Sequence, residues 1–279
     1  MNKLKFTKMH GLGNDYIYIN CLEQTLTEVS ELAKKLSKQH FGIGSDGLVL
    51  IEASKTADYK MKMFNADGSE AEMCGNAVRC VAKFLYDRGF TSKEVFSLET
   101  LGGKKKLKLN IANNKVSSVQ VEMGKPVFLA SEIPVELPEK EIINHPFEIL
   151  DQKLLLNCVS MGNPHAVFFV DEITDYQVHV LGPLIEKHLI FPDRTNVHFA
   201  KVINREEIFM RVWERGSGET LACGTGACAV LAAAVKTDKA NKNATIKLPG
   251  GDLHIEWRED QILMTGPAEF VFDGEIDYP

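Results

Sequence analysis

The chain has 279 residues, of which 44% are hydrophobic and 25% charged, a composition that excludes the disordered, fibrous and membrane-embedded classes. Its 32 basic and 38 acidic side chains give a net charge of −6, and no Lys/Arg-rich stripe offers the footprint that a nucleic acid requires. Residues 1–10 hold no apolar stretch long enough for a signal peptide or a membrane span. We therefore expect a cytoplasmic protein, with reduced cysteines, that binds neither membrane nor nucleic acid.

The predicted elements run in the same order twice along the chain. A strand at residues 16–19 follows Gly13-Asn14, and a helix follows Cys74 and ends near Gly89. An alternating segment after Gly102-Gly103 predicts a hairpin, and the first copy ends near residue 120. The second copy predicts a strand at 166–169, a helix after Cys223 that ends within 236–238, and a hairpin at 249–251.

The two copies align in one register, because an offset of 149 residues carries Gly13-Asn14 onto Gly162-Asn163 and Cys74 onto Cys223. Apolar residues lie at positions +4, +7, +8 and +11 after each cysteine, the stripe of a helix packed on a core. They are Val78, Val81, Ala82 and Leu85 in the first copy and Ala227, Val230, Leu231 and Ala234 in the second. The repeat predicts two pseudo-symmetric α+β domains, each with a mostly antiparallel sheet around a central helix.

We place the first domain at residues 1–119 plus 266–279, carrying Cys74, and the second at 120–265, carrying Cys223. Residues at equivalent places near a pseudo-two-fold axis face each other across a cleft, where ligands tend to bind. Cys74 and Cys223 are therefore the candidate catalytic pair.

Each cysteine is expected in the first turn of its helix, where free N–H groups lower the pKa of a thiol. The amides of Gly75-Asn76 and Gly224-Thr225 could then hold one α-carboxylate between them. One thiolate would remove the α-proton while the opposite thiol protonates the other face, which inverts the carbon centre. This scheme for an amino-acid racemase or epimerase requires no pyridoxal phosphate or other cofactor.

Other patterns favour structural roles. The remaining cysteines have no partner in the repeat register and are interpreted as small apolar core residues: Cys21, Cys80, Cys158 and Cys228. No Cys-x-x-Cys or His-x-x-x-His spacing is present, so we expect no metal. Gly42-x-Gly44-x-x-Gly47 matches a dinucleotide fingerprint in outline, but no βαβ pattern surrounds it, and this interpretation has little weight.

Several segments resemble the diaminopimelate epimerase family over nearly the whole chain. They are Gly11-Leu12-Gly13-Asn14-Asp15-Tyr16, Phe64-Asn65-Ala66-Asp67-Gly68-Ser69, Met73-Cys74-Gly75-Asn76-Ala77-x-Arg79-Cys80, Gly162-Asn163-Pro164-His165, Glu214-Arg215-Gly216 and Ala222-Cys223-Gly224-Thr225-Gly226. The resemblance implies interconversion of LL- and meso-2,6-diaminopimelate, in lysine and peptidoglycan precursor biosynthesis, by a two-base mechanism on Cys74 and Cys223. The implied partner is this small-molecule substrate, and a homodimer is left open.

The resemblance also implies roles for the binding residues. Asn14, Asn65, Asn163, Asn196 and Arg215 are expected to bind the distal amino-acid end of the substrate, with help from the backbone of Glu214, whereas Gly75, Asn76, Gly224 and Thr225 hold the reacting end. A guanidinium suits the distal carboxylate and amide oxygens suit the distal ammonium. His165 and Glu214 are candidates for tuning the thiols. Gly47 departs from family members that carry glutamine there.

Three alternatives are weighed against this hypothesis. Proline and hydroxyproline racemases share the two-cysteine logic but typically have histidine after Cys-Gly, where this chain has Asn76. A non-catalytic amino-acid-binding protein would explain Arg215 but not two matched cysteines. A redox switch that joins Cys74 to Cys223 is interpreted as a liability of the site, because mild oxidation would stop turnover.

Overall fold

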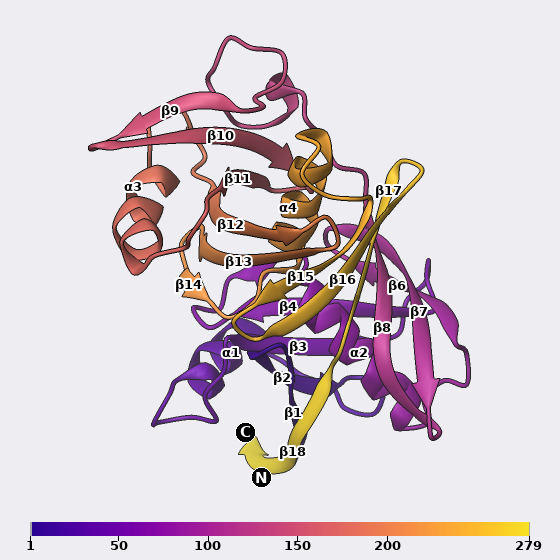
Figure 1. Ribbon diagram of the computed structural model, residues 1–279. Helices are drawn as coiled ribbons and strands as arrows, with labels where there is room; N and C mark the ends of the chain where they lie inside the picture. Colours follow the sequence, from indigo (N-terminus) through magenta and orange to yellow (C-terminus); the bar gives the residue numbers. More distant parts are fainter. Residues whose placement is uncertain (1, 279) are drawn as a thin grey trace. The chain divides into compact units, whose positions relative to one another are not determined.

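The computed structural model describes residues 2–278, which form two compact units (Figure 1). Unit 1 comprises Met1–Val121 with Gly266–Pro279, and unit 2 comprises Glu122–Thr265. The repeat predicts that the first domain ends at residue 119 and that the chain re-enters this domain at residue 266. No helix within residues 2–278 is both long and apolar enough to cross a membrane.

Unit 1 consists of a curved sheet and two helices. Its elements are β1 (Asn2–Gly11), β2 (Asn14–Asn20), α1 (Val29–Ser37), β3 (Gly47–Glu52), β4 (Tyr59–Asn65), β5 (Glu70–Ala71), α2 (Gly75–Asp87), β6 (Val95–Thr100), β7 (Gly103–Ala112), β8 (Lys115–Gly124, whose last residues belong to unit 2) and β18 (Glu269–Tyr278). The sheet runs β18-β1-β2-β3-β4-β6-β7-β8, with β5 also on β4, and only β2–β3 and β4–β6 are parallel among these pairs.

Unit 2 repeats this plan. Its elements are η1 (Ala130–Glu132), β9 (His145–Ile149), β10 (Gln152–Ser160), β11 (Pro164–Phe169), η2 (Gln177–Leu181), α3 (Gly182–Glu186), β12 (Asn196–Asn204), β13 (Glu207–Glu214), β14 (Gly218–Thr220), α4 (Gly224–Lys236), β15 (Asn243–Leu248), β16 (Gly251–Arg258) and β17 (Gln261–Gly266, ending in unit 1). The order is β9-β10-β11-β12-β13-β15-β16-β17, again with two parallel pairs, β11–β12 and β13–β15.

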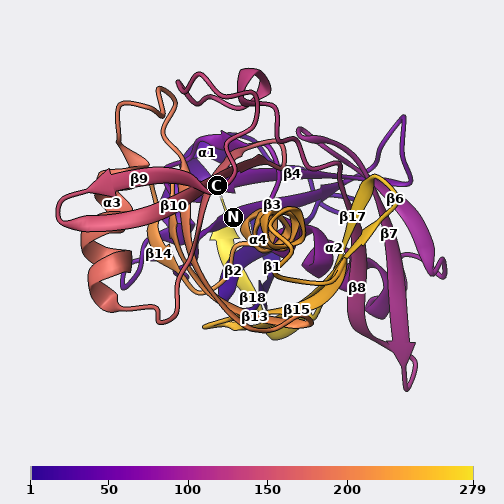
Figure 2. The ribbon, with the colours of Figure 1, turned by 45° about the horizontal axis from the view of Figure 1, so that its top comes forward.

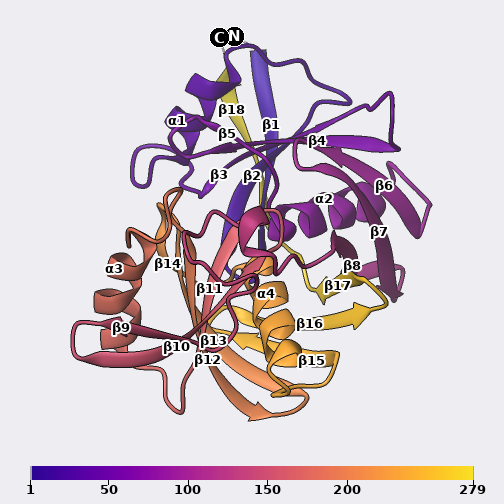
Figure 3. The same ribbon diagram turned by 90° about the horizontal axis from the view of Figure 1, so that it is seen from above.

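The same sequence of pairings in both units confirms the predicted pseudo-symmetric α+β architecture. In each, the strands wrap one helix: α2 packs on β1, β2 and β7, and α4 packs on β10, β11, β12, β15 and β16. Figure 2 looks almost along α4, with β13 and β15 curving beside it, and Figure 3 shows α2 between β2 and β7. The outer strand that β9 provides in unit 2 is provided in unit 1 by β18, at the other end of the chain.

The two central helices form where the apolar spacing predicts them. All eight stripe residues are fully buried, which supplies the hydrophobic stabilisation that a 13-residue helix lacks by itself. Gly89 ends α2 with a φ of 79°, and Asp238, with a φ of 55°, follows α4. The predicted helix ends and the hairpins at Gly102 and Gly250 are confirmed.

Candidate functional site

Cys74 and Cys223 hold matching backbone positions at the starts of α2 and α4. Both are N-caps in extended conformation, with φ and ψ of −129° and 121° for Cys74 and −123° and 108° for Cys223. The expectation of a cysteine in the first turn is therefore wrong by one residue. An N-cap side chain lies beside the unpaired N–H groups of the first turn, and Cys223 Sγ accepts from Gly226 N at 3.4 Å.

In unit 1, Asn14 connects the half-buried Cys74 to its surroundings. The Sγ atom of Cys74 donates to Asn14 Oδ1 at 3.2 Å, and Asn76 Nδ2 donates to the same oxygen at 3.3 Å. The Asn14 amide can present its oxygen here because its Nδ2 donates to Asp46 Oδ2 at 2.7 Å. Three of the predicted site residues are thus in contact.

Asp46 fixes the orientation of that amide. The same Oδ2 atom also accepts from the backbone N–H of Asp15 at 3.1 Å. Burial raises the pKa of Asp46 and the charge of Asp15 acts in the same direction, whereas the hydrogen bonds from Asp15 N and Asn14 lower it. Asp15 in turn forms an ion pair with the buried Lys8. Asp46 belongs to the Gly42–Gly47 segment, whose cofactor interpretation has little weight; here it serves the cysteine cluster.

Behind Asn76, the fully buried Arg79 holds the first turn of α2. Its Nη2 donates to Asn76 Oδ1 at 2.7 Å, and its Nε donates to the carbonyl of Pro267 at 3.0 Å. Because Asn76 accepts from Arg79, its Nδ2 group is directed to Asn14. The guanidinium therefore orders the amide one helical turn before it.

In unit 2, Cys223 is 5% exposed and lies among polar groups. Its Sγ is 3.6 Å from Thr225 Oγ1, and Asn163 Nδ2 donates to the same hydroxyl at 3.5 Å. Glu214, at the end of β13, accepts a hydrogen bond from Thr220. The arrangement brings a second set of the predicted residues together around the second thiol.

The electrostatics of Cys223 differ from the expected ones. Burial raises the pKa of the thiol well above its usual value, and the negative charge of Glu214 raises it further. The hydrogen bonds from Thr225 and Gly226 oppose this rise but do not overcome it. The N–H group of Gly226 at the helix start lowers the pKa, as predicted, but the prediction that the pKa lies below its usual value is wrong, because dehydration of a buried anion outweighs the two hydrogen bonds. Cys223 is therefore protonated at neutral pH.

His165 lies beside this cluster rather than on the thiol. Its Nε2 is 2.9 Å from Asn163 Oδ1, and its Nδ1 is 2.8 Å from His198 Nε2. Burial lowers its pKa well below the usual range, and the nearby His198 and Arg215 lower it further. His165 is thus a neutral imidazole that contacts a predicted binding residue.

Asn196 and Arg215 are joined through the backbone. Asn196 Oδ1 accepts from Arg215 N at 3.0 Å, and its Nδ2 donates to the Pro164 carbonyl at 2.9 Å. The Arg215 side chain is exposed and donates to the Asp193 carbonyl at 3.1 Å. Asn196 thus ties the Arg215 backbone to β11, and the Asp193 carbonyl holds the guanidinium.

Asn65 and Gly47 lie opposite each other on β4 and β3, next to Asp46. Asn65 Nδ2 donates to Ser69 Oγ at 3.0 Å within its own turn, and the backbone N–H of Ala66 donates to the Asp46 carbonyl at 3.1 Å. At Gly47 a Cβ would lie 2.1 Å from the carbonyl oxygen of Phe64, so a side chain there would require the backbone to move.

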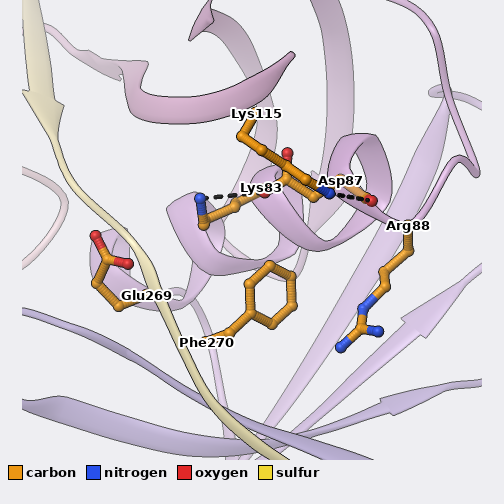
Figure 4. Close-up of a pocket in the computed structure, with 6 residues that line it drawn as sticks. All are labelled: Lys83, Asp87, Arg88, Lys115, Glu269 and Phe270. Carbon is orange, nitrogen blue, oxygen red and sulfur yellow. Dashed lines mark hydrogen bonds and ion pairs between the residues drawn. The ribbon is translucent and has the colours of Figure 1, made fainter. Parts of the chain in front are cut away.

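A surface cavity of about 410 Å³ in unit 1 contains neither cysteine (Figure 4). Both of its lysines have partners: Lys83 Nζ is 3.1 Å from Asp87 Oδ2, and Lys115 Nζ donates to the Asp87 carbonyl at 3.2 Å. The Arg88 guanidinium lies over the ring of Phe270. These pairings are consistent with a structural role at the end of α2.

The remaining cysteines follow the expectation. Cys80, Cys158 and Cys228 are fully buried, and Cys21 is half-buried against the core of unit 1. Within residues 2–278 no three His, Cys, Asp or Glu side chains gather as ligands for a metal ion.

Sequence reasoning assigned no site role to Asp46, Arg79 or His198, although Arg79 stands in one of the segments that resemble the family. Arg79 follows Asn76 by three residues, a spacing that places the two on one helix face. His198 follows Asn196 by two residues on a strand, which puts both side chains on the same side. These spacings place each residue on the same face as a predicted binding residue, but many other residues have the same spacing, so they do not identify a site.

The fold is shared with solved structures of low sequence identity. A probable proline racemase from Agrobacterium radiobacter K84 superposes with a TM-score of 0.72, covering 99% of this chain and 93% of the other at 15% identity. That likeness defines the fold class, two similar α+β halves.

Sequence comparison is more specific. The family described as diaminopimelate epimerase matches residues 6–129 and 157–271. A diaminopimelate epimerase of Acetivibrio thermocellus is 55% identical over 98% of this chain and 99% of its own length, and one of Methanococcus maripaludis is 54% identical over 98% and 100%. The chain belongs to the diaminopimelate epimerase family.

Proposed function

We propose that this protein is an isomerase that interconverts LL- and meso-2,6-diaminopimelate without pyridoxal phosphate, with Cys74 and Cys223 as acid and base. The observation that carries the proposal is the pair of thiols at equivalent N-caps in a chain 55% identical to a diaminopimelate epimerase. Lysine and peptidoglycan precursor biosynthesis follows as the proposed setting.

The reaction is a proton exchange at one carbon. A thiolate takes the α-proton and becomes a thiol, while the electron pair of the C–H bond is delocalised into the α-carboxylate. The opposite thiol then delivers its proton to the other face of the carbon and becomes a thiolate, so the enzyme ends with its roles exchanged. Cys223, whose pKa is raised, serves as the proton donor in one direction and recovers its proton in the other.

The α-proton is weakly acidic, so its removal requires stabilisation of the resulting negative charge, which the helix dipoles supply. The N–H groups of Gly75 and Asn76 in α2, and of Gly224 and Thr225 in α4, are the first-turn donors that we assign to the α-carboxylate. Such donors act most strongly on the charge that accumulates in the enediolate.

Specificity is assigned to the distal amino-acid group. Arg215 is exposed and carries the guanidinium proposed to bind the distal carboxylate, while Asn14, Asn65, Asn163, Asn196 and the Glu214 carbonyl supply further polar contacts. Glu214 also raises the pKa of Cys223, in keeping with a thiol-tuning role.

A homodimer and a cytoplasmic location complete the proposal. Val271 and Phe272 on β18 are 53% and 47% exposed, an apolar pair of the kind that subunit contacts cover. Sedimentation of the wild type and of Phe272→Glu tests the dimer, because a charge in such a contact would yield monomers. Cell fractionation tests the location.

The test is α-deuteration of LL-2,6-diaminopimelate in D₂O, measured together with formation of the meso isomer. Wild-type protein is expected to give deuterated meso product, and Cys74→Ala and Cys223→Ala are expected to give none. Cys80→Ala and Cys228→Ala are matched controls, since each removes a buried thiol from the same helices. Absence of exchange in the wild type would refute the assignment, and proline and hydroxyproline would be tried next.

A further inference from the structure

His198 is a fully buried histidine of β12 that the two-base mechanism does not use. Its ring packs on the first turn of α4, because a Cβ built on Gly226 would lie 2.3 Å from His198 Cε1 and 3.0 Å from Nδ1. The Nε2 atom is 2.8 Å from His165 Nδ1, whereas Nδ1 has no hydrogen-bond partner within residues 2–278.

Both rings are neutral, so each carries one N–H group. Burial lowers the pKa of His198 to about 3 and that of His165 well below its usual value. If the His198 proton were on Nδ1, a buried donor would lack an acceptor and would meet the positive end of α4. With the proton on Nε2, a lone pair faces that helix start instead. The second tautomer is therefore the stable one.

The position of the His198 proton determines the tautomer of His165 and, through it, the orientation of the Asn163 amide. His198 Nε2–H donates to His165 Nδ1, so His165 carries its own proton on Nε2 and donates to Asn163 Oδ1 at 2.9 Å. The oxygen of Asn163 is thereby occupied, and its Nδ2 group is presented toward Thr225.

The repeat-related asparagine has the opposite polarity. Asn14 donates through Nδ2 to Asp46 and presents its oxygen to Cys74. One copy of the repeat therefore displays an acceptor and the other a donor, although the residue type is the same. The difference arises from the group behind each amide, a carboxylate in unit 1 and a histidine pair in unit 2.

We propose that His198 is a positioning residue, which sets the tautomer of His165 and thereby holds the Asn163 amide with its N–H groups toward a carboxylate of the substrate. The inference rests on the proposed function, in which Asn163 binds the distal amino-acid end. His198 itself touches neither the substrate nor the reacting atoms.

The first test reads the tautomers directly. Long-range ¹H–¹⁵N correlation spectra of the wild-type protein, with His165 and His198 assigned from His165→Gln and His198→Gln, are expected to show the proton on Nε2 of both rings. In His198→Phe, which keeps a ring but removes the donor, His165 is expected to lose its pure Nε2–H form. A proton on Nδ1 of His198 in the wild type would overturn the proposal.

The second test separates positioning from stability. Asn163 contacts a part of the substrate that does not react, so its contact is equal in ground and transition states and its loss raises KM more than it lowers kcat. A hydrogen bond to a charged group corresponds to about ten- to hundredfold in affinity, and we expect KM of His198→Phe to rise about tenfold or more. His198→Gln restores an N–H donor and is expected to recover most of the wild-type KM. His254→Phe, on an exposed face of β16, is the matched control.

The outcomes are distinguishable. A folded His198→Phe with unchanged KM and an unchanged His165 tautomer would reduce His198 to a packing role and refute the inference. If this variant does not fold, the wild-type tautomers and the KM of His198→Gln decide whether His198 positions Asn163. If the wild type does not epimerise diaminopimelate, the proposed function fails, while the tautomer measurement still decides whether His198 controls His165.

Discussion

Replacing Gly226 with alanine adds one methyl group where α4 meets β12. The new Cβ would lie 2.3 Å from His198 Cε1 and 3.0 Å from Cys223 Sγ. Carbon atoms in contact rest about 3.5–4.0 Å apart, so the ring or the helix must move by roughly 1 Å or more. Overpacking of this kind costs about 1–3 kcal/mol, and alanine's better helix propensity offsets at most about 1 kcal/mol of it.

The expected result is a lower urea midpoint, together with a fall in kcat/KM of about 10- to 100-fold, because a displacement of about 1 Å at a reacting group is enough for such a loss. A double-mutant cycle isolates the cause: in a His198→Ala background the obstructing ring is absent, and Gly226→Ala should cost much less stability. Equal costs in the two backgrounds would show that the ring is not the obstacle, and the packing argument would be wrong.

Three further predictions follow from buried groups. Arg79→Met removes a fully buried guanidinium that donates to Asn76 and to the Pro267 carbonyl, and it should lower the free energy of unfolding by about 2–4 kcal/mol in urea titrations, whereas Arg258→Met, on an exposed pair, should change it by less than about 0.5 kcal/mol. Glu214→Gln removes a negative charge that raises the pKa of Cys223, so the pH midpoint of Cys223 alkylation by iodoacetamide should fall, and an unchanged midpoint would contradict the assigned cause. Burial raises the pKa of Cys80 from 9.0 to about 12, so the folded state keeps a proton that the unfolded state releases; stability should fall above pH 9 by up to about 1.4 kcal/mol per pH unit for this thiol, and less steeply in Cys80→Ala, as measured by unfolding at pH 8–11.

Local patterns were sufficient for the architecture. The apolar stripes and the glycines that end helices depend on residues close in sequence, and the repeat register compares short segments 149 residues apart; together they predicted the α+β halves and both central helices. The cysteine pair followed from the same register. A helix N-cap and a first turn differ by one residue, which periodicity does not resolve.

The groups behind the site were decided by tertiary structure. Asp46 is 32 residues from Asn14, and His198 is 33 residues from His165, so only the folded strands bring each pair into contact. The pKa of Cys223 shows the same dependence, because a helix start is visible in the sequence but burial beside Glu214 is not. The sequence by itself determined the fold, the family and the equivalent positions of Cys74 and Cys223 at two helix starts, since these are recorded in spacing and residue type. Which way each asparagine amide points, and whether the thiol of Cys223 is charged, depend on burial and distant partners, and only the tertiary structure decides them.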